Sequence, residues 1–381
     1  MTAGETLLDA FINANVLLMI CLSFWFVLRA AMQHLGLRYA YGTQLRLLKL
    51  MFVVIALAPF IAAGFRALQS GGFARGVNIN LSDAVVAYYL NGGFEMDSSR
   101  FEAMVLMRDS FSLNILNAEG WGAQAVIVMF LLGLGLGVVR LASSVFCLWR
   151  IVNASYDWRQ FGRLKLRLSD RTLVPFSTRG LRNYYVVIPS HMLSETTELK
   201  VALAHELQHI RQGDLEWEVA MEALKPVFYL NPAYHLWKRQ VEYLRELICD
   251  KEVILRGRVD LRAYCETLLS VCQKTLRRDR AFVVAVPKVT LVTADRKAMV
   301  PRKRSFLEHR IHSALEVKRA RFQHLVFAAL SVPLLAITTL TTLAIQSPGD
   351  WSQDRLMLST VVNLDRLDEI NRLSTFGRLR E

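Results

Sequence analysis

Long apolar stretches interrupt the chain at four places, and each is close to the length that a helix needs to cross a bilayer. Such a helix takes about 20 mainly apolar residues. The four stretches contain almost no charged residues, which predicts membrane spans rather than buried helices of a soluble core. They cover residues 7–28, 47–65, 121–139 and 324–346.

Between the third and fourth stretches, the pattern changes to that of a folded domain in water. Residues 184–188 form a β-branched and aromatic run that Pro189 closes, which predicts a strand. Residues 194–214 and 234–253 have apolar positions at helical spacing. We therefore predict an α+β integral membrane protein with a mainly helical inner domain that carries a small β-sheet. Its predicted parts are a membrane domain at 1–150 with an external loop at 66–120, the inner domain at 151–323, the fourth span and a short external tail at 347–381.

The distribution of charge along the chain predicts which segments lie on each side of the membrane. A hydrophobic content of 53% excludes a disordered chain, yet the formal net charge is +13. That excess is carried by residues 150–321, whereas loop 66–120 has more acidic than basic residues. Because basic loops stay in the cytoplasm, the inner domain is predicted to be cytoplasmic and both termini external. Attraction to anionic lipid accounts for the charge, and without a zinc-finger or ribonucleoprotein motif we expect no nucleic-acid partner.

One of the predicted helices carries the motif His205-Glu206-Leu207-Gln208-His209. Residues four apart lie on one face of a helix, so His205 and His209 can occupy two corners of a tetrahedral Zn²⁺ site. Glu206 is close enough to take a proton from metal-bound water without being a ligand. The motif therefore predicts a metallopeptidase with Glu206 as its catalytic base.

The next predicted helix supplies a third ligand. Glu246 and Asp250 are one turn apart on one face of the 234–253 helix. We interpret Glu246 as the third ligand of one zinc ion per chain, and Asp250 as the carboxylate that orients a ligand histidine. Glu242, one turn earlier, is the alternative ligand.

Together, these motifs resemble the BlaR/MecR family of membrane gluzincins, which signal the presence of β-lactam antibiotics in bacteria. The resemblance covers about residues 140–346 and rests on 183–189, on the run HELQHIRQGD at 205–214, on Asn231-Pro232 and on 245–250. It implies a multi-pass protein of the bacterial inner membrane. It also implies that His205, His209 and Glu246 are the zinc ligands and Glu206 the catalytic base.

The chain departs from that family after its last span. The antibiotic receptors carry a penicillin-binding sensor domain there, whereas about 35 residues follow here, without a Ser-x-x-Lys motif. We therefore expect no acylation by β-lactams. A signal is expected to enter through loop 66–120, the tail, the bilayer, a signal-sensing partner or a second copy of the chain.

The substrate is expected to bind along a strand. In gluzincins, an edge strand pairs with the substrate backbone, and Tyr185, Val186 and Val187 are the candidates here, unless their strand lies inside the sheet. The extended segment 282–293 is a candidate element for self-cleavage or gating.

Three functions compete. The first is a zinc endopeptidase that cleaves a cytoplasmic protein, such as a transcriptional repressor, or itself, in signal-regulated proteolysis. The second is constitutive processing or quality control of membrane proteins, as in HtpX-like gluzincins. The third is a membrane scaffold that retains a zinc fold, against which the intact Glu206 argues.

Overall fold

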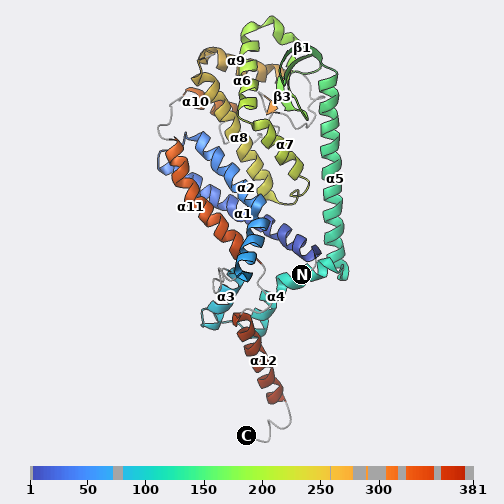
Figure 1. Ribbon diagram of the computed structural model, residues 1–381, viewed down its shortest axis with the longest axis vertical. Helices are drawn as coiled ribbons and strands as arrows, with labels where there is room; N and C mark the ends of the chain where they lie inside the picture. The colour runs from blue at the N-terminus through green and yellow to red at the C-terminus, as the bar shows by residue number, and fades with distance from the viewer. Residues whose placement is uncertain are drawn as a thin grey trace. The chain divides into compact units, whose positions relative to one another are not determined.

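The computed structural model describes residues 3–71, 80–257, 259–277, 289–290, 306–315, 323–346 and 353–373, which are mostly helical (Figure 1). The helices before the sheet are α1 (Ala3–His34), α2 (Tyr41–Ser70), α3 (Leu81–Leu90), α4 (Ser98–Leu116) and α5 (Gly120–Asn153). The strands are β1 (Tyr156–Phe161), β2 (Leu164–Ser169), β3 (Phe176–Arg179), β4 (Tyr184–Pro189) and β5 (Val289–Thr290). After β4 follow the short 3-10 helix η1 (Ser190–Ser194), α6 (Thr196–Arg211), α7 (Asp214–Leu224), α8 (Pro232–Leu255), α9 (Leu261–Arg277), α10 (Phe306–Leu315), α11 (Gln323–Ala344) and α12 (Gln353–Leu373).

The four predicted membrane spans are confirmed as long apolar helices. Within the described ranges, α1, α2, α5 and α11 are the helices long and apolar enough to cross a membrane. They indicate a multi-pass membrane protein. The first, second and third of them have 32, 30 and 34 residues. Because about 20 residues suffice to span a bilayer, these three helices continue beyond the hydrocarbon core.

The chain divides into two compact units. One consists of Met1–Phe26, Lys49–Leu131 and Ala328–Glu381, and the other of Val27–Leu48 and Leu132–Phe327. In the first unit, α3, α4 and α12 pack through a small apolar cluster of Val86, Phe101, Leu358 and Val362. The sequence patterns had predicted no element in loop 66–120 or in the tail, so these three helices are additions to the expected fold.

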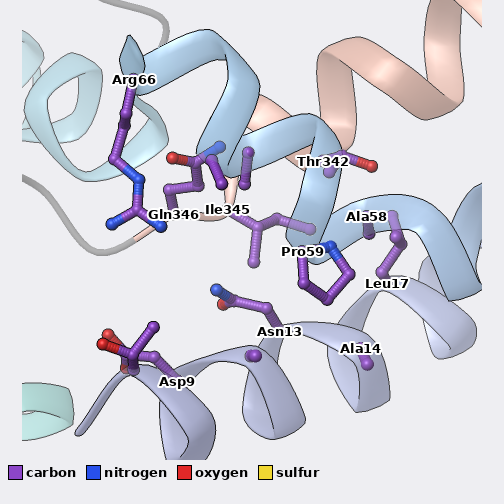
Figure 2. A pocket seen from close by; sticks show the side chains of 14 residues that line it. Asp9, Asn13, Ala14, Leu17, Ala58, Pro59, Arg66, Thr342, Ile345 and Gln346 are labelled. Carbon is purple, nitrogen blue, oxygen red and sulfur yellow. The ribbon is translucent and has the colours of Figure 1, made fainter. Parts of the chain in front are cut away.

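The first unit also encloses a cavity of about 110 Å³ between α1, α2 and α11 (Figure 2). Apolar side chains such as Leu17 and Pro59 line part of it, and polar ones that include Asp9, Asn13 and Arg66 line the rest. The side-chain nitrogen of Gln346 is buried and has no hydrogen-bond partner in the described part of the chain.

The second unit contains a mixed five-stranded sheet with the order β1-β2-β4-β3-β5. Strands β2 and β4 are parallel, with Leu164 opposite Tyr184, and the other pairs are antiparallel. The central strand β4 is apolar on both faces because both are covered. Val186 and Ile188 face the main core, whereas Val187 packs with Leu148 and Val152 of α5.

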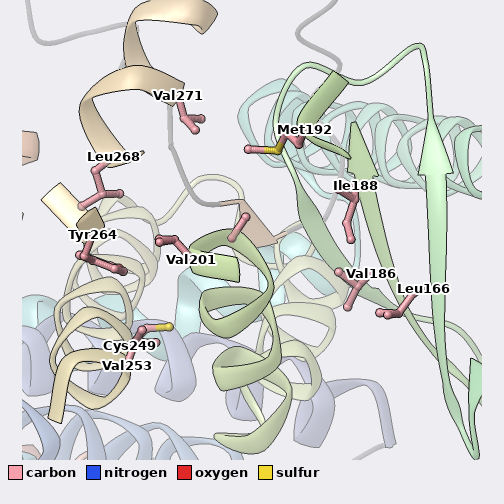
Figure 3. Close-up of a cluster of buried hydrophobic side chains, with 11 residues drawn as sticks. Leu166, Val186, Ile188, Met192, Val201, Cys249, Val253, Tyr264, Leu268 and Val271 are labelled. Carbon is pink, nitrogen blue, oxygen red and sulfur yellow. The ribbon is translucent and has the colours of Figure 1, made fainter. Parts of the chain in front are cut away.

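The main core joins the sheet to the helices that carry the predicted chemistry (Figure 3). Val201 and Ala202 of α6 are wholly buried, as are Cys249 of α8 and Leu268 of α9. The buried members are Leu166, Val186, Ile188, Met192, Val201, Ala202, Cys249, Val253, Tyr264, Leu268 and Val271. Since fully burying one such side chain contributes about 1.5–3 kcal/mol, this cluster holds α6, α8 and α9 in fixed relative positions.

Two glycines of α5 allow this helix to pack closely against other residues of the second unit. A Cβ at Gly133 would lie 1.9 Å from the ring of Tyr229, and one at Gly137 would lie 3.0 Å from the backbone of Pro226. A larger residue at Gly133 would therefore displace Tyr229, so the small side chains of this helix serve packing within the chain.

Candidate active site

The histidines of the predicted motif lie side by side on the buried face of α6. Both His205 and His209 are fully buried, and their rings meet edge to face. The Nε2 atoms of the two rings are 3.1 Å apart. This is the arrangement expected from residues four apart on a helix.

Glu246 of α8 completes this group. One of its carboxylate oxygens is 3.5 Å from Nε2 of His205, and the other is 3.6 Å from Nε2 of His209. Neither oxygen has a hydrogen-bond partner among the described residues, although Glu246 is only 1% exposed. Glu242, the alternative third ligand, instead forms an ion pair with Lys238 at 2.6 Å and is half-buried.

Cys249 also lies near the two histidines. Its sulfur and the histidine nitrogens form a buried group whose ligand atoms lie within 4.8 Å of one another. However, Sγ is 3.5 Å from Nδ1 of His205, the nitrogen turned away from His209, and 3.4 Å from the carbonyl oxygen of His205. Burial raises the pKa of the thiol well above its usual range, and Asp250 raises it further. Glu246 is therefore better placed than Cys249 to bind a metal together with both Nε2 atoms.

The remaining ring nitrogens are held by residues of three other elements. Nδ1 of His209 is 3.0 Å from Oδ2 of Asp214, the first residue of α7. Nδ1 of His205 is 3.0 Å from the hydroxyl of Tyr264 in α9, which in turn donates to Asp250. Asp250 itself is 3.5 Å from the same Nδ1. When each Nδ1–H donates to its oxygen, the Nε2 lone pairs stay free for a metal.

Glu206 is buried beside these groups. Neither of its carboxylate oxygens has a hydrogen-bond partner of good geometry in the described ranges. Burial raises the pKa of this carboxyl well above its usual range, Ser177 of β3 lowers it, and Glu246 raises it further. Burial also lowers the pKa of His209 well below its usual range, so this imidazole is neutral, as a metal ligand must be.

Comparison with known families agrees with this geometry. The family model described as BlaR1 peptidase M56 matches residues 123–298. These residues form an M56 peptidase domain. No curated protein matches the chain. Residues 123–298 are thus a metallopeptidase domain of the M56 type, and the HExxH motif lies within them, as do Glu246, Asp250 and Tyr264.

A buried network of charges supports α8 of the M56 domain. Glu218 of α7 accepts from Lys238 and from Arg245, each at 2.7 Å. The Nε of Arg245 is also 3.8 Å from the carboxylate of Glu246. Because buried ion pairs are stable only when each charge is compensated, this network fixes the rotation of α8 and thereby the direction of Glu246.

The predicted substrate strand is not at the edge of the sheet. β4 lies between β2 and β3 and pairs with both, and Val186 and Val187 are fully buried. The prediction that Tyr185, Val186 and Val187 bind the substrate backbone by strand addition is therefore wrong, because those backbone groups are already paired. In the M56 domain β3 is nearer to that role, since it carries Ser177 and pairs with β5 only through Phe176 and Ser177.

Sequence reasoning missed three residues of the site. Asp214 is part of the run that carried the resemblance, so its position after Gly213 was a usable signal. Tyr264 and Arg310 lie far from the motif in the sequence and have no local pattern. Arg310 of α10 donates to Asp250 at 2.6 and 2.7 Å.

Proposed function

We propose that this M56 metallopeptidase is a zinc endopeptidase in which His205, His209 and Glu246 hold one zinc ion per chain. The observation that carries the proposal is the convergence of two Nε2 atoms and a carboxylate within 3.6 Å of one another. Two imidazoles and one carboxylate form the ligand set of a catalytic zinc site that keeps a fourth position open.

The donor atoms fit such an ion. Two unprotonated nitrogens that face each other at 3.1 Å repel unless a proton or a cation lies between them. A buried carboxylate without a hydrogen-bond partner is also costly. Because both features occur at the same point, a divalent cation relieves both at once.

Glu206 is the base in this proposal. A bound zinc ion would lower the pKa of a water molecule to about 7 and polarise the scissile carbonyl. Glu206 then accepts a proton from the attacking water and returns it to the leaving amine. Its raised pKa suits both steps, since a carboxylate with a low pKa would not take the proton from water and hold it until the amine leaves.

Asp214 and the pair of Tyr264 and Asp250 act on the ligands rather than on the substrate. Asp214 keeps His209 in the tautomer with a proton on Nδ1. On the other ligand, the hydroxyl of Tyr264 accepts a hydrogen bond from Nδ1 of His205 and donates one to Asp250. Asp250 thus orients His205 mainly through Tyr264.

The proposed substrate is a cytoplasmic protein, such as a transcriptional repressor, or the chain itself, cleaved in response to a signal. The basic excess of residues 150–321 supports a cytoplasmic site, with both termini outside an inner membrane. Self-cleavage is supported by β5, because this short strand of the same chain pairs antiparallel with β3 next to α6. A bound peptide would pair with β3 in the same manner. The rest of the candidate segment 282–293 lies outside the described residues.

The membrane spans give the proposed signal its route. Loop 66–120, the tail, the bilayer, a sensing partner or a second copy of the chain can each act on them. The basic surface is proposed to face anionic lipid, with no nucleic-acid partner.

The full-length protein in detergent tests the proposal through three forms. These are the wild type, Glu206→Gln and the control Glu252→Gln, which changes a half-buried glutamate of α8 that pairs with Arg256. We expect about one zinc per chain in all three by elemental analysis. Cleavage of labelled casein should be lost only in Glu206→Gln, by a factor of about 10²–10⁴.

Each other result leads to a different conclusion. Zinc without cleavage in wild type, even after addition of the membrane fraction, would indicate the scaffold function. Absence of zinc in all three forms would refute the ligand assignment. In cells, accumulation of many membrane proteins in the Glu206→Gln strain would indicate the HtpX-like processing role instead of regulated cleavage of one soluble target.

A further inference from the structure

One arginine reaches the site from outside the matched domain. Arg310 lies in α10, beyond residue 298, and is 2% exposed. Its Nε and Nη2 donate to the two oxygens of Asp250 at 2.7 and 2.6 Å, and Nη1 is 3.5 Å from the carboxylate of Glu246. Arg310 therefore holds the carboxylates of Asp250 and Glu246 at fixed positions relative to each other, because a guanidinium is planar and its N–H groups can bind two carboxylates at once.

The same guanidinium also lies over an aromatic ring. The Cζ of Arg310 is 5.8 Å from the ring centre of Phe306, one turn earlier in α10. Phe306 in turn packs against Tyr243 of α8, with ring centres 5.4 Å apart. His309 stacks on the same tyrosine at 5.6 Å. Tyr243 therefore fixes the position of α10, and with it the position of Arg310.

Tyr243 also contacts α1, a candidate membrane span. Arg29, near the end of α1, lies over the tyrosine ring with its Cζ 5.7 Å from the ring centre. It also donates to Gln240 of α8 at 2.5 Å. This end of α1 belongs to the same compact unit as α8 and α10. An unbroken series of contacts therefore joins a candidate membrane span to the carboxylate of Glu246.

We propose that Arg310 is a positioning residue for Glu246, and that Tyr243 and Phe306 make its position depend on the end of α1. The inference rests on the proposed function, because it takes Glu246 to be a metal ligand. A shift of α1 at Arg29 displaces the Tyr243 ring and α10, since packed interiors transmit displacement rather than absorb it. Arg310 then draws the Glu246 carboxylate toward or away from the histidines. The signal that regulates the peptidase thus acts on ligand geometry.

Replacement of zinc by Co²⁺ in the full-length protein in detergent tests this, because the visible absorption of cobalt reports ligand geometry without any substrate. The variants are Arg310→Lys, Arg310→Gln, Arg29→Gln and the double variant Arg29→Gln/Arg310→Gln. The control is Arg262→Gln, which removes an exposed arginine of α9 paired with Glu266. Thermal unfolding identifies any variant that fails to fold, and Arg310→Lys keeps the buried charge if Arg310→Gln does not fold.

The expected pattern is specific. Both Arg310 variants bind cobalt with a changed absorption band, while kcat on labelled casein falls about tenfold or more and KM changes less. Arg29→Gln changes the band in the same direction by a smaller amount. This change disappears in the Arg310→Gln background, because the effect of Arg29 passes through Arg310. The Arg262→Gln control matches the wild type.

A wild-type cobalt band in both Arg310 variants would overturn the positioning role. Independent, additive effects of Arg29→Gln and Arg310→Gln would overturn the link to α1. If the wild type binds cobalt and lacks cleavage, these spectral results still decide the inference. If the wild type binds no cobalt, the proposed metal site fails, and the inference fails with it.

Discussion

Replacement of Asp214 by asparagine isolates one orienting contact of the proposed metal site. Asp214 begins α7 directly after Gly213, whose φ of +68° allows the tight turn from α6. Its side chain is fully buried, and Oδ2 is 3.0 Å from Nδ1 of His209. Asparagine has the same shape and can still offer an oxygen, so the change removes the charge while keeping the volume.

The size of the effect follows from that contact. A hydrogen bond to a charged group contributes about 1.5–3 kcal/mol, roughly twice a neutral one. Loss of the charge also weakens the preference of His209 for the tautomer with Nδ1–H, which is the form that leaves Nε2 free. We expect the dissociation constant for zinc to rise by about 10–100-fold, as for other changes to groups that hold a ligand histidine.

Competition with a chromophoric zinc chelator measures this constant in the full-length protein. Asp157→Asn is the matched control, because its carboxylate is 74% exposed and pairs with Arg167 on the sheet. The control should bind zinc as the wild type does. A zinc affinity of Asp214→Asn within about threefold of the wild type would refute the reasoning that this carboxylate orients a ligand.

Four further substitutions give three separate tests. Glu246→Gln should lower bound zinc well below one per chain by elemental analysis, whereas Cys249→Ser should keep it; the opposite result would make Cys249 the third ligand. Burial would raise the pKa of Glu218, but Arg245 and Lys238 outweigh it and hold this pKa at about 2, against an ordinary value of 4.5. Ionised Glu218 therefore stabilises the fold above about pH 4.5, and this contribution, of order 3 kcal/mol, disappears as the pH falls toward 2. Glu218→Gln should lower the unfolding temperature at neutral pH and flatten its acid dependence, and a parallel acid curve would contradict this. Leu268→Ala in the main core should cost about 2–5 kcal/mol in chemical denaturation, and a cost below 1 kcal/mol would show that the cavity collapses.

The elements that sequence could predict are those with strong local patterns. The four spans follow from apolar length, and the His205–His209 pair and Glu246 follow from helical spacing. Helices α3, α4 and α12 were not predicted, because they mix charged and apolar residues and bury only a small cluster. Their stability depends on one another, which a local pattern does not reveal.

The errors at the site also arise because a local sequence pattern does not reveal contacts between distant parts of the chain. The order of strands in a sheet does not follow from their order along the chain. The apolar run of β4 therefore predicted a strand correctly, but it could not show that this strand lies inside the sheet and not at its edge. Tyr264 and Arg310 contact the site across 59 and 60 residues of sequence. Only the packing of α9 and α10 on α6 and α8 brings them there, whereas Asp214 is local enough to be found from the turn at Gly213.

The buried charges of the helices around the proposed metal site do not balance among the described residues. Among the described residues, six buried carboxylates belong to α6, α7 and α8, and four buried cations belong to α8 and α10. The carboxylates are Glu198, Glu206, Asp214, Glu218, Glu246 and Asp250, and the cations are Lys238, Arg245, Lys251 and Arg310. Since burial keeps His209 neutral, this histidine does not close the gap of two charges, whereas the proposed divalent cation between His205, His209 and Glu246 would. Glu206 and Glu246 are the two of these carboxylates whose oxygens have no hydrogen-bond partner in the described residues. Burial is the main cause of the raised pKa of Glu206, and the carboxylate of Glu246 raises it further, so the burial that makes an uncompensated Glu246 costly also prepares Glu206 to hold a proton.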